Sequence, residues 1–352
     1  MENQRIRSLD GLRGIFAAVV MCGHFFLIYY PYGPGYFLNL ALAVQFFFIL
    51  SGVALGCGLG NRMISGELPF WAFARQRFAR LYPMHLLSMA AAGLFIGKIY
   101  GSIPSSGNFV FDTVANLLLL QAVSFSWNVV SWSISTEFWI GLLILPFAIR
   151  RLSGMAALAL SIGAYAATFL VVGTFERPFY PIAPHINSAA LSTAAGLLAG
   201  VAVYRLLSAS PAGINTRWRS WTPAIEGFLL VVILVTIIWG SRGYQEIIAL
   251  SCMPILIYLC ATSGSAVATA LSSKPMNWLG SVSYSLYLIH LPLLGALKMT
   301  GLDRIPFWPR FALFCAVALV VSQLLARYIE VPLYRRLRGS TQTPTSPLIA
   351  AR

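Results

Sequence analysis

Long uninterrupted apolar stretches recur along the whole chain. Each has about the 20 residues that a helix needs to cross the hydrocarbon of a bilayer. Within hydrocarbon only helices and closed barrels satisfy every backbone hydrogen bond, and these stretches are continuous rather than alternating, so we expect helices. Only 10% of the 352 residues are charged, against about 25% in ordinary soluble domains. We therefore expect an all-α fold, a polytopic membrane helical bundle.

The apolar stretches define ten candidate transmembrane helices. A further stretch, Phe109 to Val123, is short for a span and is expected to form a re-entrant or interfacial helix. We expect one membrane domain over 1–338 and a disordered cytoplasmic tail over 339–352, which is rich in Ser, Thr and Pro. The ten spans are 12–30, 37–60, 83–101, 131–149, 153–174, 189–207, 222–240, 247–264, 276–298 and 309–331.

The positions of the basic residues predict the orientation of the bundle. A net charge of +14 is also typical of nucleic-acid binding, but Lys and Arg fall between the apolar stretches, so we expect no nucleic-acid partner. With ten spans and a cytoplasmic N-terminus, only six of the 24 basic residues lie outside: Lys98, Arg177, Arg242, Lys298, Arg304 and Arg310. The positive-inside rule therefore favours both termini in the cytoplasm. No Cys/His spacing typical of metal ligands occurs, so we expect no metal site.

The first apolar stretch contains two polar residues, Arg13 and His24. They are eleven residues apart, so on a helix they share nearly one face and are about 16 Å apart along the axis. Arg13 is expected at the cytoplasmic surface, and His24 beyond the midplane, facing the bundle interior or a wet cavity. An unperturbed imidazole has a pKa of about 6.5, which suits proton transfer at neutral pH. The alternative is a structural histidine that is hydrogen-bonded to a neighbouring helix.

Two further arginines, Arg77 and Arg80, are i,i+3 neighbours at the cytoplasmic boundary before the third span. A planar guanidinium pairs with two phosphate oxygens at once, so such a cluster is suited to phosphate. The same charges are typical of a topology signal or a lipid-headgroup contact, and charge alone favours that interpretation.

Ser133 and Glu137 are i,i+4 neighbours early in the fourth span. A carboxylate at this depth in the membrane is costly unless it is paired. The topology places His24 in the same half of the bilayer, so we expect Glu137 to meet and orient its imidazole. A structural ion pair between Glu137 and an arginine is the alternative.

The second and ninth spans contribute further candidates. Tyr284, Tyr287 and His290 share one helical face, where a structural tyrosine–histidine hydrogen bond is a sufficient explanation. The small residues Ser51 and Gly52 indicate close helix packing when they are considered by themselves.

Together and in order, these stretches resemble the acyltransferase-3 family of integral membrane acyltransferases. Each motif is weak alone, but six in sequence at fitting spacing form a strong signal. The family often has two further residues between the glutamate and an aromatic pair, whereas Phe138 and Trp139 follow Glu137 directly here. The six motifs are RSLDGLRGIFAAVVMCGH, VQFFFILSG, RFARLYP, WSISTEFW, GSVSYSLYLIHLP and YIEVPLYRRL, the last with Glu330 and Pro332.

The resemblance implies transfer of an acyl group, commonly acetyl, from cytoplasmic acyl-CoA to a hydroxyl of a carbohydrate or lipid-linked glycan. It also implies a multi-pass protein in contact with membrane lipid, in the plasma membrane or, in a bacterium, the inner membrane. It implies roles for Arg13, His24, Arg77 and Arg80. We expect the three arginines to hold the phosphates of acetyl-CoA and His24 to act as general base.

Other residues then take supporting roles in this scheme. We expect Glu137 to orient His24, and the pantetheine arm to pass Ser51 and Gly52. The expected substrate contacts are Ser133, Tyr287 and His290, with a hydroxyl of Ser133 or Tyr287 near the developing oxyanion. An acyl-histidine or acyl-serine intermediate is an open alternative, and direct attack is preferred because no Ser-His-Asp arrangement is visible.

Two other classes of protein also place polar residues in a membrane. A transporter of a glycan or an anion would need a basic mouth, together with broken spans and often inverted repeats, which the sequence does not show. A haem-binding cytochrome would need paired histidines on facing helices, a role open to His24 and His290.

Overall fold

The computed structural model describes residues 6–30, 38–100, 108–183, 186–209, 220–240, 242–301 and 304–338. Over these ranges the chain is helical apart from connecting segments and one antiparallel pair of short strands, β1 (Pro181–Ala183) and β2 (Ile186–Asn187). The ten long helices are α1 (Arg7–Tyr29), α2 (Leu40–Ile64), α3 (Phe70–Tyr100), α5 (Trp132–Arg151), α6 (Gly154–Val172), α7 (Ser188–Ala209), α8 (Thr222–Ile238), α9 (Tyr244–Thr262), α11 (Lys274–Met299) and α12 (Phe307–Leu325). The short elements are α4 (Phe109–Leu117), α10 (Ala266–Leu271), α13 (Val331–Leu337), η2 (Val129–Ser131) and η5 (Ala326–Glu330).

Eight helical segments in these ranges are long and apolar enough to cross a membrane, which confirms a polytopic all-α bundle. The other two predicted spans, 83–101 and 222–240, are helical over residues 83–100 and 222–238. The first is the end of α3, a 31-residue helix that begins at Phe70 and continues through Pro83. The second is α8, an apolar helix of 17 residues. The tail 339–352 lies outside the described residues.

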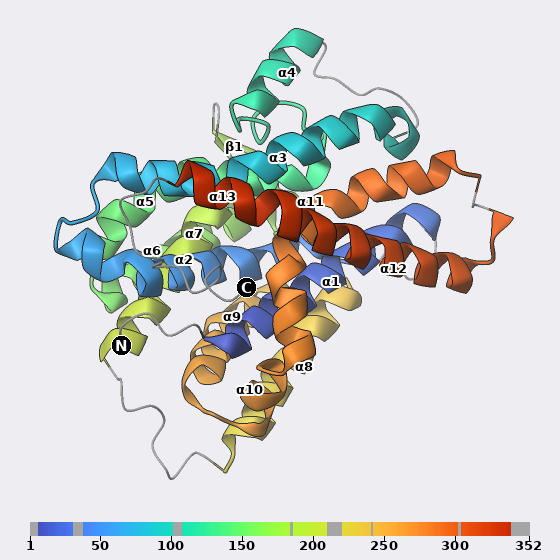
Figure 1. Cartoon of the computed structure of the whole chain (residues 1–352). Coiled ribbons are helices and arrows are strands. Elements are labelled where there is room, and N and C mark those ends of the chain that lie inside the picture. Colours follow the sequence, from blue (N-terminus) through green and yellow to red (C-terminus); the bar gives the residue numbers. More distant parts are fainter. Residues whose placement is uncertain are drawn as a thin grey trace.

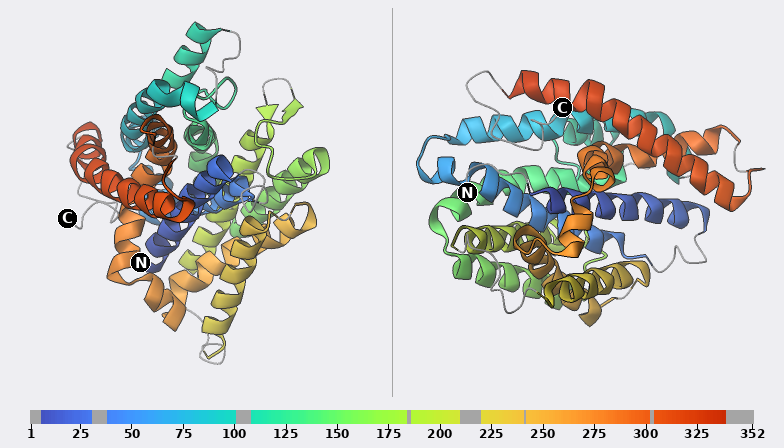
Figure 2. Two further views of the ribbon diagram at one scale, coloured as in Figure 1. Left: turned by 90° about the vertical axis from the view of Figure 1, so that its right-hand side faces the viewer. Right: turned by 60° about the horizontal axis from the view of Figure 1, so that its bottom comes forward.

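The helices are arranged around a centre formed by α1 and α2. α1 packs on α2 and on α11, α2 packs on α7, and α3 packs on α11. Figure 1 shows α12 and α13 along one face of the bundle. The first view of Figure 2 looks nearly along these helices and shows α1 enclosed, with α12 and α13 on one side and α6 to α9 on the other. Residues on α1 and α2 are therefore placed to line internal cavities.

Two glycine contacts hold this centre together. A Cβ added at Gly280 on α11 would lie 2.2 Å from the Asp10 carbonyl oxygen of α1, so the two backbones touch there. A Cβ added at Gly52 on α2 would lie 2.3 Å from the carbonyl oxygen of Leu197 on α7. Small residues permit such close helix crossings. Gly52 is thus buried against α7, which corrects the expectation that a pantetheine arm passes it.

The predicted short helix over Phe109 to Val123 is present in part, as α4, which lies outside the main bundle over α3 (Figure 1). The chain after α4 is largely non-helical, and buried side chains hold it. Asn116 Nδ2 donates to the Phe125 carbonyl (2.7 Å), and Gln121 Nε2 donates to the Ser131 carbonyl (2.9 Å). Non-helical backbone in a membrane protein needs such internal partners. These contacts fix the start of α5, which carries Ser133 and Glu137.

Candidate active site

Two cavities lie one after the other along α1 and α2. We name them inner and outer after the predicted orientation, in which Arg13 lies towards the cytoplasm. The inner cavity has a volume of about 190 Å³ and contains the three arginines singled out in the sequence. The outer cavity has a volume of about 240 Å³ and contains His24. Val44 and Tyr287 line both cavities and so form the junction between them. Polar residues that line the inner cavity are Arg13, Ser51, Gln76, Arg77, Arg80, Ser133, Glu137, Ser283, Tyr284, Tyr287 and Tyr334.

The lining residues of α2 show how the cavities are ordered. Leu40, Ala41 and Val44 line the outer cavity, and residues from Val44 to Leu59 line the inner one. At a rise of 1.5 Å per residue, 40–59 spans about 28 Å. This distance is close to the hydrocarbon thickness of about 30 Å. The two cavities together therefore extend along most of the thickness of the bundle.

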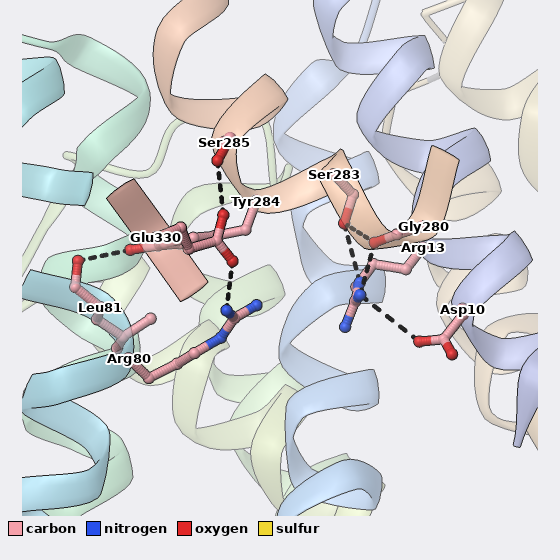
Figure 3. A network of polar contacts seen from close by, with 9 residues as sticks. All are labelled: Asp10, Arg13, Arg80, Leu81, Gly280, Ser283, Tyr284, Ser285 and Glu330. Carbon is pink, nitrogen blue, oxygen red and sulfur yellow. Dashed lines mark hydrogen bonds and ion pairs between the residues drawn. The ribbon is translucent and has the colours of Figure 1, made fainter. Parts of the chain in front are cut away.

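Arg13 reaches the inner cavity and is held there by α11 (Figure 3). Its Nε donates to Ser283 Oγ (2.9 Å) and its Nη2 to the Gly280 carbonyl (2.6 Å). Asp10, one turn earlier on α1, lies 3.5 Å from the same Nη2. The close α1–α11 crossing at Gly280 therefore also orients the guanidinium.

Arg77 of α3 forms a buried ion pair with Glu137 of α5. Nη2 of the arginine lies 2.5 Å from Oε1 of the glutamate, which also accepts a hydrogen bond from Ser51 Oγ (2.8 Å). The expected contact between Glu137 and His24 is therefore wrong, and the arginine ion pair that was the alternative is present. The reason lies in the position of α5: it begins at Trp132 beside the outer cavity. Glu137 lies about 7.5 Å further along the axis, at the level of the inner cavity.

Arg80 of α3 has an equivalent partner in Glu330, which was noted in the sequence only as part of the closing motif (Figure 3). Ser285 Oγ donates to the other carboxylate oxygen of Glu330 (2.6 Å). Glu330 is 3% exposed and ends η5, a single turn of π-helix. Such turns are frequent at functional sites because they redirect one side chain. The acidic residue in YIEVPLYRRL was the signal that could have identified this partner.

Tyr284 packs against Arg80 on its other side. The guanidinium lies 5.1 Å from the centre of the tyrosine ring, and the Tyr284 hydroxyl donates to the Leu81 carbonyl (2.7 Å). A cation over an aromatic face is stabilised by the ring quadrupole. Arg80 is thus fixed by a carboxylate and by an aromatic ring.

His24, in the last two turns of α1, faces His290 in the second half of α11. His24 Nδ1 lies 3.2 Å from His290 Nε2 and 2.9 Å from the Val20 carbonyl, and His290 Nδ1 lies 3.0 Å from the Leu286 carbonyl. A carbonyl oxygen only accepts hydrogen bonds, so in the neutral rings both Nδ1 atoms carry the proton, an assignment from the partners rather than from observed hydrogens. His24 Nε2 is then the unprotonated, basic nitrogen.

His290 supports His24 and lines neither of the two cavities described above. Its side chain is fully buried, which differs from the expected substrate contact. The ring centres of His24 and His290 are 5.0 Å apart, a separation that leaves no space for a porphyrin plane between them. Among the described residues, no three His, Cys, Asp or Glu side chains form a group that could hold a metal ion.

Ser133 and Tyr287 lie at the junction of the cavities. Their hydroxyl oxygens are 2.9 Å apart, and each lies 3.0 Å from the Val130 carbonyl. The structure thus brings these two predicted residues together, beside the arginines on one side and His24 on the other. Trp132 and Phe179 of the outer cavity were not singled out in the sequence, because aromatic residues are common throughout the chain. Glu176 was not singled out either, because it lies between two predicted spans, where a charged residue is ordinary.

Comparison with known proteins gives consistent matches. The family model described as "Acyltransferase domain", of the acyltransferase-3 family, matches residues 6–327. The chain is 26% identical over 403 residues to "Acyltransferase MdmB" of Streptomyces mycarofaciens, over 97% of this chain and 95% of that protein. It is 23% identical over 364 residues to "Putative peptidoglycan O-acetyltransferase YrhL" of Bacillus subtilis (strain 168), over 94% of this chain and 55% of that protein. No solved structure matches.

Proposed function

Since this chain belongs to the acyltransferase-3 family and is a multi-pass membrane O-acyltransferase, we propose that its donor is acyl-CoA, with acetyl as the acyl group. The proposed acceptor is a hydroxyl of a carbohydrate or lipid-linked glycan. One observation carries this proposal: an arginine-lined inner cavity and a histidine-lined outer cavity meet at Val44 and Tyr287. A donor and an acceptor that enter from opposite faces would meet at that junction.

The inner cavity has the chemistry to hold the phosphates of the donor. Each guanidinium has five N–H donors, so a carboxylate partner leaves others available for phosphate oxygens. Arg77 shows this directly, because its buried Nε has no hydrogen-bond partner among the described residues. A buried charged donor without a partner is rare and calls for a ligand or water. Glu137 and Glu330 would then position Arg77 and Arg80 for the donor.

The acyl transfer follows from the positions around the junction. The acceptor hydroxyl oxygen attacks the thioester carbonyl carbon while His24 Nε2 takes its proton. The carbon–sulfur bond then breaks, and coenzyme A leaves as a thiol with that proton. General base catalysis of this kind contributes about 10²–10⁴-fold. The hydroxyls of Ser133 and Tyr287 are the candidate donors to the negative charge that develops on the carbonyl oxygen.

The test uses purified protein in lipid nanodiscs, labelled acetyl-CoA and surface glycans from cells that lack the gene. We expect labelled glycan from the wild-type protein, and turnover at least about 100-fold lower in His24→Gln with an unchanged KM for acetyl-CoA. His85→Gln is the matched control, because His85 is a buried histidine on α3 that bonds the Asn116 carbonyl outside both cavities. Near-normal turnover in His24→Gln would remove His24 from the chemistry. An inactive wild-type protein would reject the donor or the acceptor class.

A further inference from the structure

We propose that the mouth of the outer cavity is a subsite for a single sugar ring, in which Phe179 contacts the C–H face of the ring and Glu176 accepts hydrogen bonds from its hydroxyls. This inference rests on the proposed function and extends it, because it names the residues that select the acceptor. It starts from the lining of the outer cavity, where Phe179, Trp132 and Glu176 share one space with His24.

The aromatic part of the subsite is a corner formed by two rings. The ring centres of Phe179 and Trp132 are 6.1 Å apart and their planes meet at 73°. Phe179 is 44% exposed, whereas Trp132 is buried, so Phe179 offers a free face and Trp132 forms the wall behind it. The negative face of an aromatic ring attracts weakly positive C–H groups, which line the faces of a pyranose.

The backbone around Phe179 is fixed by hydrogen bonds to the start of α7. Ala189 N donates to the Pro178 carbonyl (2.8 Å), and Ser188 N donates to the Tyr180 carbonyl (2.9 Å). Tyr180 N in turn donates to the Arg177 carbonyl (3.2 Å). The exposed phenylalanine is therefore held on both sides and does not depend on a ligand for its position. A rigid aromatic platform loses little entropy when a ligand binds.

The polar part of the subsite is an ion pair at the mouth of the cavity. Arg242 Nη2 donates to Glu176 Oε1 (3.0 Å), and the two side chains are 51% and 30% exposed. Such exposed pairs contribute little to stability. Glu176 lines the cavity, and its carboxylate suits sugar hydroxyls because it accepts hydrogen bonds; Arg242 is outside the lining and holds that carboxylate. An acyl chain would gain nothing from this charged pair, which favours a sugar over a lipid tail.

The size of the outer cavity suits a single sugar ring. Its volume of about 240 Å³ is below the roughly 300–1,000 Å³ of pockets that enclose drug-sized ligands. The cavity is open on one side, so one ring can lie in it while the remainder of a longer acceptor stays outside. His24 and Tyr287 line the same space, so a hydroxyl on the ring can approach the basic nitrogen.

The binding test uses saturation-transfer NMR on wild-type protein in nanodiscs. The probes are the methyl glycosides of glucose, galactose, N-acetylglucosamine and rhamnose. We expect transfer to the ring protons of at least one glycoside, a loss of at least fivefold in Phe179→Ala, and retention in Phe179→Tyr. Tyr180→Ala is the matched control, because Tyr180 is a neighbouring aromatic residue of similar exposure, 40%, outside the cavity lining.

Three outcomes would overturn the subsite. These are no transfer from the wild-type protein to any of the four glycosides, equal signals in Phe179→Ala and Tyr180→Ala, or transfer confined to the methyl aglycone. In the acyl-transfer assay, Phe179→Ala and Glu176→Gln should each raise the acceptor KM at least about tenfold and leave the acetyl-CoA KM unchanged. If wild-type protein binds a glycoside but does not use acyl-CoA, the proposed function fails and the subsite stands, so the two failures are distinguishable.

Discussion

The inner and outer cavities contain different kinds of polar residue. In the inner cavity, two arginines on one helix each face a buried carboxylate from another helix: Arg77 faces Glu137, and Arg80 faces Glu330. In the outer cavity the interior group is an imidazole, His24, whose partners are a carbonyl and a second imidazole. Charge in a membrane interior is costly unless it is paired. Under the proposed function, the inner residues serve both folding and donor binding, whereas we expect changes to the outer residues to affect the chemistry more than the folding.

Removing one partner of an inner ion pair tests whether the inner residues support folding. We expect Glu330→Leu to destabilise the fold, by no more than about 3–5 kcal/mol, because it leaves the half-buried Arg80 guanidinium, which is 21% exposed, without its carboxylate. The double variant Arg80→Met with Glu330→Leu should recover most of that loss, because both charges are then absent. Unfolding in mixed detergent and denaturant measures the stability.

The same double variant separates folding from donor binding. It should fold and yet bind acetyl-CoA at least about tenfold more weakly, because one guanidinium of the cavity is absent. Donor KM in the acyl-transfer assay provides the second measurement. A double variant with normal donor affinity would show that Arg80 is structural only.

At the junction of the two cavities, removal of the Tyr287 hydroxyl tests whether this group stabilises the developing oxyanion. Tyr287→Phe should lower kcat by about 100-fold with little change in stability, because one donor to the developing oxyanion is lost. Tyr165→Phe is the control, since its hydroxyl donates to Gln45 Oε1 (3.2 Å) and Tyr165 lines neither cavity. Equal kcat in the two variants would place the oxyanion elsewhere.

In the outer cavity, His290 tests whether His24 is positioned by its neighbour. His290→Phe should lower kcat by about tenfold and leave both KM values unchanged, because His24 Nδ1 keeps the Val20 carbonyl but loses the second of its two acceptors, which holds the ring and its tautomer in place. His290→Gln, which restores an acceptor, should recover activity. Nitrogen-15 spectra of labelled histidine report the tautomer directly. An unchanged His24 tautomer in His290→Phe would assign His290 a packing role.

The smallest expected effect concerns the size of the junction. Val44 lines both cavities, so Val44→Ala enlarges the space where they adjoin and should shift the preference for propionyl-CoA over acetyl-CoA by about tenfold, the value of one methylene in an apolar site. Val53→Ala is the control, because Val53 is fully buried on the same helix and lies outside both cavity linings. Equal selectivity in the two variants would move the acyl group away from Val44.

The sequence predicts the parts of this arrangement that depend on one helix. Hydropathy identifies the spans, and helical periodicity places Arg13 and His24 on one face, where they line the inner and outer cavities respectively. The predicted third span begins at residue 83, within α3 rather than at its first residue, Phe70, because the first turns of this helix carry arginines that an apolar criterion excludes. The helix continues through that boundary because one face of those turns packs on the bundle.

The pairings between helices could not be predicted in the same way. Glu137 is 60 residues from Arg77, and His24 is 266 residues from His290. These contacts depend on which helices cross and at what depth, and the crossings are set by glycines such as Gly280. Glu137 illustrates the consequence. Its place in a span predicted that the carboxylate has a partner, but the expected partner was His24 of α1, whereas the observed one is Arg77 of α3.

The central claim is that a donor in the inner cavity and an acceptor in the outer cavity meet at Tyr287 from opposite faces of the membrane. The most direct test uses sealed right-side-out vesicles that contain the protein, with labelled acetyl-CoA enclosed and a membrane-impermeant glycan outside. We predict label on the external glycan, which His24→Gln abolishes, and none when acetyl-CoA is supplied only outside. Transfer only when both compounds are on the same side of the membrane would contradict the claim.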